Sequence, residues 1–144
     1  MSEIHIPMKN PRVLNKMRNN DLFTILKREK KISANLIRQF QDRYGKIFFR
    51  ALDFLQNEGA KVTKYEFQPS GYVLWTIAGS ESEYLLYPDE YCQCQNFLIN
   101  SIYRKRAFYP CKHLLAQKLA EALDQYKIEK KRDKEYKNLL KRLK

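Results

Sequence analysis

The sequence predicts an α+β fold with N-terminal helices, a three-stranded antiparallel β-meander and a C-terminal helix. Apolar residues recur at three- and four-residue steps before residue 59, and branched and aromatic residues separated by turn signals follow. The length of 144 residues suits one domain, and a hydrophobic content of 44% is enough for a core. We therefore expect one compact domain in three segments: a helical segment at 1–59, a β-rich segment with a helix at 60–126, and a basic helical tail at 127–144.

The main helix of the first segment is predicted over about residues 34–57. Ser33 is a typical N-cap residue, and Gly59 is a natural stop. Between them, one apolar stripe runs at helical spacing and consists of Leu36, Phe40, Tyr44, Ile47, Phe48, Ala51, Leu52 and Leu55. This helix should form the main helical wall of the core.

The meander is predicted from strand-forming residues that alternate with turn signals. Strands are expected near 62–67, 72–78 and 84–87. Pro69-Ser70-Gly71 separates the first two, and Gly79-Ser80 separates the last two. Tight turns of this kind join neighbouring antiparallel strands.

The formal net charge of +12 is unevenly distributed. Counting Lys and Arg against Asp and Glu, residues 1–50 carry +8, 51–91 carry −5, 92–126 carry +3 and 127–144 carry +6. Basic ends attract phosphate backbones or an acidic protein face. The alternative is a charged surface that serves only solubility.

The sequence contains no apolar run near 18 residues, and residues 1–9 lack the apolar stretch of a signal peptide. We therefore expect a cytoplasmic protein that does not span a membrane.

All three cysteines and one of the two histidines form one pattern, C-x-C, then 16 residues, then C-x-H, at Cys92, Cys94, Cys111 and His113. Three thiolates and an imidazole are a common tetrahedral set for structural zinc. Residues two apart in extended chain face the same side, so the first two cysteines can bind one ion. The last two ligands lie at the start of the C-terminal helix, where the helix dipole favours a thiolate. The alternative is three buried thiols and a core histidine.

Four protein ligands leave no open position for water or substrate, so the predicted site is structural and holds one Zn²⁺. With three thiolates its net charge is −1, which Lys112 and the basic residues 104–106 are placed to offset.

These residues resemble the SWIM zinc finger, in which a β-hairpin, C-x-C, a variable loop, C-x-H and a helix follow one another over about residues 60–125. Cys111, His113 and Ala116 also match the longer C-x-H-x-x-A form, which is similar to the SWIM subunit of Shu-type homologous-recombination complexes. A stand-alone chain with a helical N-terminal segment suits that subunit, in an archaeal form. Gln93 departs from many SWIM sequences, which have a small residue there.

The resemblance implies a non-enzymatic adaptor that pairs with a RecA-family recombinase paralogue. The pair would assist recombinase filaments on single-stranded DNA in homologous recombination and DNA repair. It also implies that Ala116 packs close to the zinc site. We expect the partner to contact the apolar residues of the tail, namely Leu139, Leu140 and Leu143.

A second hypothesis is a zinc module that binds DNA directly, in transcription or in the control of mobile elements. The candidate contacts are the basic residues Arg104, Lys105, Arg106 and Lys112. The nearby Tyr103, Phe108 and Tyr109 would stack on unpaired bases, or else pack around the zinc site.

No catalytic residues are predicted, and we expect that the protein is not an enzyme. Gly45-Lys46 does not belong to a phosphate-binding loop, because Phe40 stands at the first glycine position and Ile47 at the Ser/Thr position. The sequence offers no Ser-His-Asp arrangement, since His5 is the one histidine outside the zinc pattern.

Overall fold

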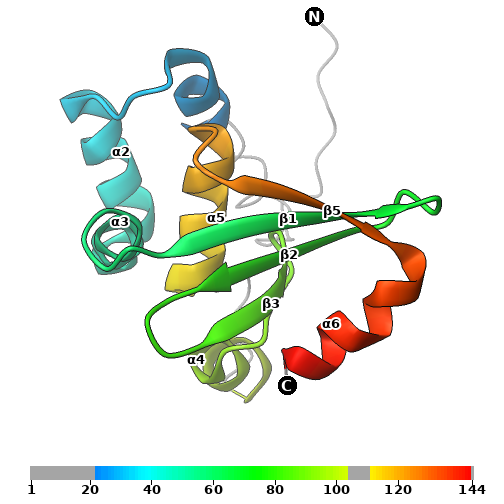
Figure 1. The fold of residues 1–144 in the computed structure, drawn as a ribbon. Coiled ribbons are helices and arrows are strands. Elements are labelled where there is room, and N and C mark those ends of the chain that lie inside the picture. Colours follow the sequence, from blue (N-terminus) through cyan, green and yellow to red (C-terminus); the bar gives the residue numbers. More distant parts are fainter. Residues whose placement is uncertain (1–21, 104–110, 144) are drawn as a thin grey trace, which may run out of the picture.

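A five-stranded sheet, in the order β4-β3-β2-β1-β5, lies between helices in the computed structural model, which describes residues 22–103 and 111–143 (Figure 1). The strands are β1 (Lys61–Gln68), β2 (Val73–Ala78), β3 (Glu83–Tyr87), β4 (Tyr91–Cys92) and β5 (Lys127–Arg132). The helices are residues 22–29, α2 (Ala34–Tyr44), α3 (Lys46–Gln56), α4 (Gln95–Phe97), the π-helix η1 (Leu98–Tyr103), α5 (Lys112–Ala122), the 3₁₀-helix η2 (Asp133–Glu135) and α6 (Tyr136–Arg142). The predicted α+β class is confirmed.

The three predicted strands form the antiparallel meander β1-β2-β3, with Tyr65 opposite Leu74 and Trp75 opposite Leu86. The strand count was nevertheless wrong. β4 adds a short antiparallel pair at one edge, and β5 pairs in parallel with β1 at the other.

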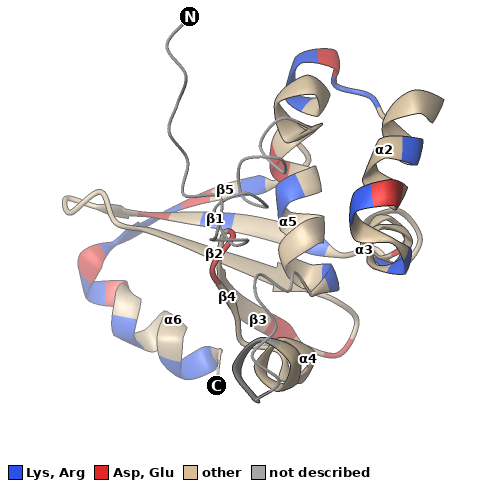
Figure 2. Ribbon diagram, turned by 180° about the vertical axis from the view of Figure 1, so that it is seen from behind, with Lys and Arg blue, Asp and Glu red and all other residues tan. Residues whose placement is uncertain are grey.

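Residues 127–132, which were predicted to be part of a helical tail, are the edge strand β5. Five of its six residues are charged, and Ile128 is 48% exposed. The strand therefore gains little from burying its own side chains, and its backbone pairing with β1 holds it in place. Lysines on an exposed edge also discourage pairing with other chains. Basic residues continue from β5 into α6 (Figure 2).

The predicted helix over about 34–57 is two helices, because Gly45 breaks it. Gly45 has φ 64° and ψ −139°, a conformation that residues with a Cβ rarely adopt. Ser33 caps α2 as predicted, since its hydroxyl accepts a hydrogen bond of 3.2 Å from the Leu36 N–H. The break turns α3 relative to α2. Phe48 and Ala51 of the predicted stripe are buried in α3, but Phe54 is the third buried residue, and Leu52 and Leu55 are only partly buried.

The sheet has a core on each face. The larger core joins residues 22–29, α2, α3 and α5 to one face, and Phe40, Phe48, Ile77 and Leu119 are fully buried in it. The smaller core packs α6 against the other face and consists of Tyr65, Phe67, Leu74, Leu139 and Leu143. Figure 1 shows α2, α3 and α5 gathered near one end of the sheet, while the β1–β2 hairpin extends away from them toward α6.

The leucines predicted to face a partner pack within this chain instead. Leu139 is 4% exposed, Leu143 is 5% exposed, and Leu140 packs partly buried beside them. The helical spacing of Leu139 and Leu143 correctly indicates one apolar face, but that face covers the sheet.

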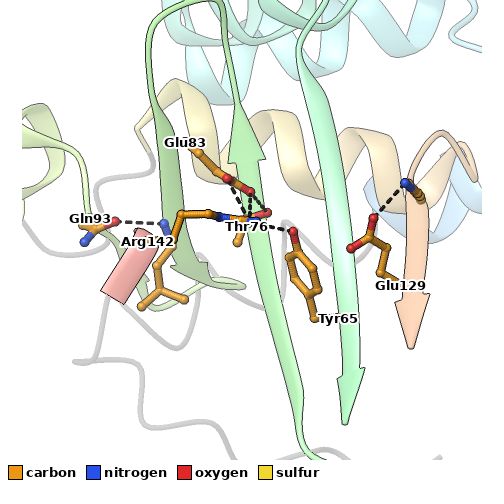
Figure 3. A network of polar contacts seen from close by, with 8 residues as sticks. Tyr65, Thr76, Glu83, Gln93, Glu129 and Arg142 are labelled. Carbon is orange, nitrogen blue, oxygen red and sulfur yellow. Dashed lines mark hydrogen bonds and ion pairs between the residues drawn. The ribbon is translucent and has the colours of Figure 1, made fainter. Parts of the chain in front are cut away.

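A polar network also joins α6 to the sheet (Figure 3). The Arg142 guanidinium donates hydrogen bonds to the Tyr65 hydroxyl at 3.0 Å and to the Glu83 carboxylate at 3.2 Å. Glu83 also accepts a hydrogen bond of 2.9 Å from the fully buried Thr76 hydroxyl. The ion pair between Arg142 and Glu83 is partly exposed and therefore adds little to stability; it mainly fixes the position of α6 on the sheet.

In the part of the chain that the structure describes, no helix combines the length and apolar character needed to cross a membrane.

Candidate metal centre

The four predicted ligands meet at one buried point. Cys92 ends β4, Cys94 is the N-cap of α4, Cys111 is the N-cap of α5, and His113 lies in the first turn of α5. Their ligand atoms all lie within 4.8 Å of one another. Because the chain between Cys94 and Cys111 spans 16 residues, the spacing alone did not ensure this convergence.

The cluster fits a zinc ion. Zinc–sulfur bonds of about 2.3 Å in a tetrahedron place the ligand atoms about 3.8 Å apart. Cys111 Sγ lies 4.0 Å from His113 Nδ1, so small side-chain adjustments are enough to close the site around an ion. The three cysteines are not joined by disulfides and are 1% to 3% exposed. A buried Cys₃His set of this size is compatible with one structural Zn²⁺.

Hydrogen bonds among the three thiols shift their pKa values in different directions. Hydrogen bonds from the S–H groups of Cys111 and Cys92 lower the pKa of Cys94. The bonds that Cys92 makes with Cys111 and Cys94, together with burial, raise the pKa of Cys92. A zinc ion bound here would displace the sulfhydryl protons, because cysteine binds metal as the thiolate.

Gln93 sets the conformation of the C-x-C segment. Its backbone N–H donates to the Leu85 carbonyl at 3.0 Å, and its side-chain oxygen accepts from the Leu85 N–H at 3.0 Å. Both bonds continue the pairing of β3 with β4 beyond Cys92 and leave the two cysteines on one side. In the sequence, Gln93 stood out only as a departure from many SWIM sequences; in the structure its two bonds to Leu85 fix the backbone between the two cysteines.

The C-x-H segment begins α5 as predicted. Cys111 has an extended backbone and its carbonyl accepts the first helical hydrogen bond, from the Leu115 N–H at 3.1 Å. The hydrogen bond with Cys92 and the Leu114 N–H at the helix start lower the pKa of Cys111, but the neighbouring Cys94 and burial raise it and prevail. Ala116 is fully buried one turn beyond His113, in the same core as the ligands.

Two aromatic side chains that the sequence analysis did not select hold the His113 ring. Phe54 of α3 meets it edge-on with the ring centroids 5.2 Å apart, and Tyr84 of β3 lies at 4.8 Å. Space for Phe54 comes from Gly79, because a Cβ there would lie 2.9 Å from the Phe54 ring. The sequence did not indicate Phe54, because a continuous helix over 34–57 would place Leu52 and Leu55 on the buried stripe instead.

The predicted basic contacts are only partly described. Lys112 is half-buried, and its ammonium group lies 4.8 Å from the centre of the Phe54 ring, close to the ligand cluster. Arg104, Lys105 and Arg106 lie outside the described residues, as do Phe108 and Tyr109. Residues 95–103, expected to be loop, form α4 and η1.

The chain is 30% identical over 95 residues to the zinc finger SWIM domain-containing protein 7 homolog of Dictyostelium discoideum. The chain resembles a SWIM zinc-finger protein. The matched residues amount to 65% of this chain and 59% of that relative, so the chain spans about three fifths of the relative's length. No family model matches the chain, and no solved structure matches it.

The similarity and the buried Cys₃His cluster together confirm the predicted SWIM-type resemblance and its zinc cofactor. A zinc ion held by these four side chains would cross-link the β4 edge of the sheet to α5. Four protein ligands would leave no open coordination position, as in structural rather than catalytic zinc sites.

Replacing Gln93 by alanine is expected to destabilise the protein by about 1–2 kcal/mol, because the Leu85 N–H would lose its hydrogen-bond partner. It should also weaken zinc binding, since Cys92 and Cys94 would no longer be aligned by the strand. Urea unfolding at fixed free zinc measures the first effect, and competition with a coloured chelator measures the second. Gln95→Ala, at a nearby exposed position, is the control. Equal behaviour of the two variants would show that Gln93 does not align the ligands.

Proposed function

We propose that this chain is a non-enzymatic adaptor that pairs with a RecA-family recombinase paralogue and assists homologous recombination and DNA repair. The observation that carries the proposal is the C-x-H-x-x-A form of the site. Cys111, His113 and Ala116 all lie buried at the start of α5. Their spacing is that of the C-x-H-x-x-A form, which resembles the SWIM subunit of Shu-type complexes.

The closed ligand set supports a structural role for the metal. A zinc ion with three thiolates and one imidazole has no position free to activate water. The similarity to a SWIM domain-containing protein supports the zinc-finger part of the proposal, and the recombination role extends beyond it.

Co-purification tests the pairing. The zinc-loaded full chain would be expressed with each RecA-family paralogue encoded in the same genome and analysed by size-exclusion chromatography. We expect a stable complex with one paralogue. The main recombinase of that genome serves as the control for general affinity to the RecA fold. Separate elution of every folded paralogue from the folded chain would refute the pairing.

A further inference from the structure

The outer edge of β5 is open to a further strand. β5 is the last strand on its side of the sheet and pairs with β1 through one side of its backbone (Figure 1). Successive residues of a strand direct their N–H and C=O groups to opposite sides, so about half of these groups point away from β1. Within residues 22–103 and 111–143, no other strand pairs with β5. The Arg132 N–H bonds to the Glu135 carboxylate at 2.8 Å, which ends the edge at η2.

The parallel register divides the β5 side chains between the two faces of the sheet. The residues in register with Thr63, Tyr65 and Phe67 share the face that α6 covers, and they are Lys127, Glu129 and Lys131. The alternate residues lie on the opposite face, and they are Ile128, Lys130 and Arg132. On the α6 face, Glu129 pairs with Lys127 at 2.7 Å, and the Lys131 ammonium lies 5.9 Å from the centre of the Tyr65 ring. The charges on that face therefore already have partners.

The opposite face of β5 carries charge without a partner. Lys130 and Arg132 are exposed, and neither forms an ion pair within the described part of the chain. Glu66 lies beside Lys130 in the register but pairs with Lys64, at 3.5 Å. Ile128, on the same face, is 48% exposed. A hollow of about 480 Å³ lies at the end of this edge, and its lining consists of Gln68, Lys130, Lys131, Arg132, Lys134 and Glu135.

We propose that the outer edge of β5 binds an acidic extended segment of a partner protein, which adds a sixth strand to the sheet. Such a segment supplies both hydrogen-bond donors and acceptors, which the N–H and C=O groups along the edge require. Its carboxylates would lie opposite Lys130 and Arg132, where opposite charges on paired strands attract. This contact uses the edge of β5 alone and does not depend on the paralogue pairing proposed above.

Two other occupants suit the edge less well. The phosphate oxygens of a nucleic acid accept hydrogen bonds but cannot donate them, so they would leave the edge carbonyls unused. A second copy of this chain would place lysines opposite lysines, and like charges on paired strands repel. Lysines on an edge therefore discourage self-pairing, while they attract an acidic strand.

The spacing along β5 also predicts the side-chain pattern of the segment. The side chains opposite Ile128, Lys130 and Arg132 lie two residues apart on one face, and we expect one apolar and two acidic residues there. Antiparallel pairing is slightly more stable than parallel pairing, so the segment should run opposite to β5. Its pattern would then be acidic-x-acidic-x-apolar.

The test measures binding of a labelled peptide to the zinc-loaded full chain by fluorescence anisotropy, with no paralogue present. The peptide has roughly eight residues, an ordinary strand length, with two glutamates and a valine at the patterned positions and threonine between them. Two further peptides carry N-methyl groups on alternate residues. Because alternate N–H groups face opposite sides, only one of the two sets blocks the bonds to β5. We expect one N-methylated peptide to lose binding and the other to keep it.

A charge variant and hydrogen exchange assign the contact to β5. K130Q/R132Q should weaken peptide binding by about 2- to 30-fold, as expected for two exposed ion pairs. K46Q/R50Q removes equal charge from exposed positions of α3 and should bind like the parent. In the parent protein, amide exchange within residues 127–132 should slow when the peptide binds, because the outward N–H groups become hydrogen-bonded.

Four results would overturn the proposal. Equal behaviour of the two N-methylated peptides would show that the peptide does not add as a strand. Equal loss of binding in K46Q/R50Q and K130Q/R132Q would indicate general attraction to a basic protein. Displacement of the peptide by oligo-dT at equal charge concentration would identify nucleic acid as the occupant. A dimer in size-exclusion chromatography that the peptide dissociates would identify a second copy. None of these results bears on the paralogue complex.

Discussion

Removing zinc from the folded protein is expected to unfold β4, α4 and the start of α5 together, and to destabilise the rest. Each of these elements contributes a ligand, and the described contacts of β4 are few because it pairs over only two residues. Structural zinc contributes about 10–16 kcal/mol in small peptide sites. That exceeds or equals the whole stability of a typical domain, about 5–15 kcal/mol.

Elemental analysis and circular dichroism measure this effect. Natively purified protein should contain about one zinc per chain, as expected for a closed four-ligand site. An excess of chelator should abolish the folded signal, and added zinc should restore it. The same chelator saturated with zinc is the control. If natively purified protein were folded but contained no zinc, the buried thiols would stabilise the core without a metal.

Replacing Phe54 by alanine is expected to cost about 3–5 kcal/mol of stability, because the side chain is 5% exposed and its loss leaves a cavity in the larger core. The same change removes the ring that orients His113 from α3. Groups that orient a metal ligand typically change metal affinity by about 10–100-fold when removed, so zinc binding should weaken by that order.

Phe49→Ala provides the matched control, since Phe49 lies on the same helix and is 42% exposed. Its effect on stability should stay within about 0.5 kcal/mol. Urea unfolding of both variants at one free zinc concentration separates stability from metal loading. If Phe54→Ala lost stability but bound zinc as tightly as the parent, His113 would be held by Tyr84 alone.

The ligand set was predictable because the chemistry of zinc restricts both residue type and local spacing. C-x-C in extended chain and C-x-H at a helix start each present two ligands within a few residues. The side chains that pack around the ligands could not be predicted from the sequence. Phe54 and Tyr84 reach His113 from α3 and β3, and no local pattern connects those positions with residue 113.

The prediction of one continuous helix was wrong at Gly45, for a physical reason. A hydrophobic stripe continues across Gly45 at helical spacing, so periodicity alone predicts one helix. The positive φ of Gly45 ends α2 and starts α3 in a new direction. Glycine permits that break without requiring it, and packing against α5 on the sheet selects it.

The sequence by itself determined the α+β class, the meander and the four zinc ligands, because each depends on periodicity or spacing within short segments. Only the tertiary structure decided the secondary structure and the packing of residues 127–143. β5 has almost no apolar pattern, and it is a strand because β1 offers an unpaired edge after α5 has crossed the sheet. Leu139 and Leu143 face inward for a similar reason, since the far face of the sheet exposes Tyr65 and Phe67 unless α6 covers them. Long-range pairing and burial therefore override the local pattern where that pattern is weakest.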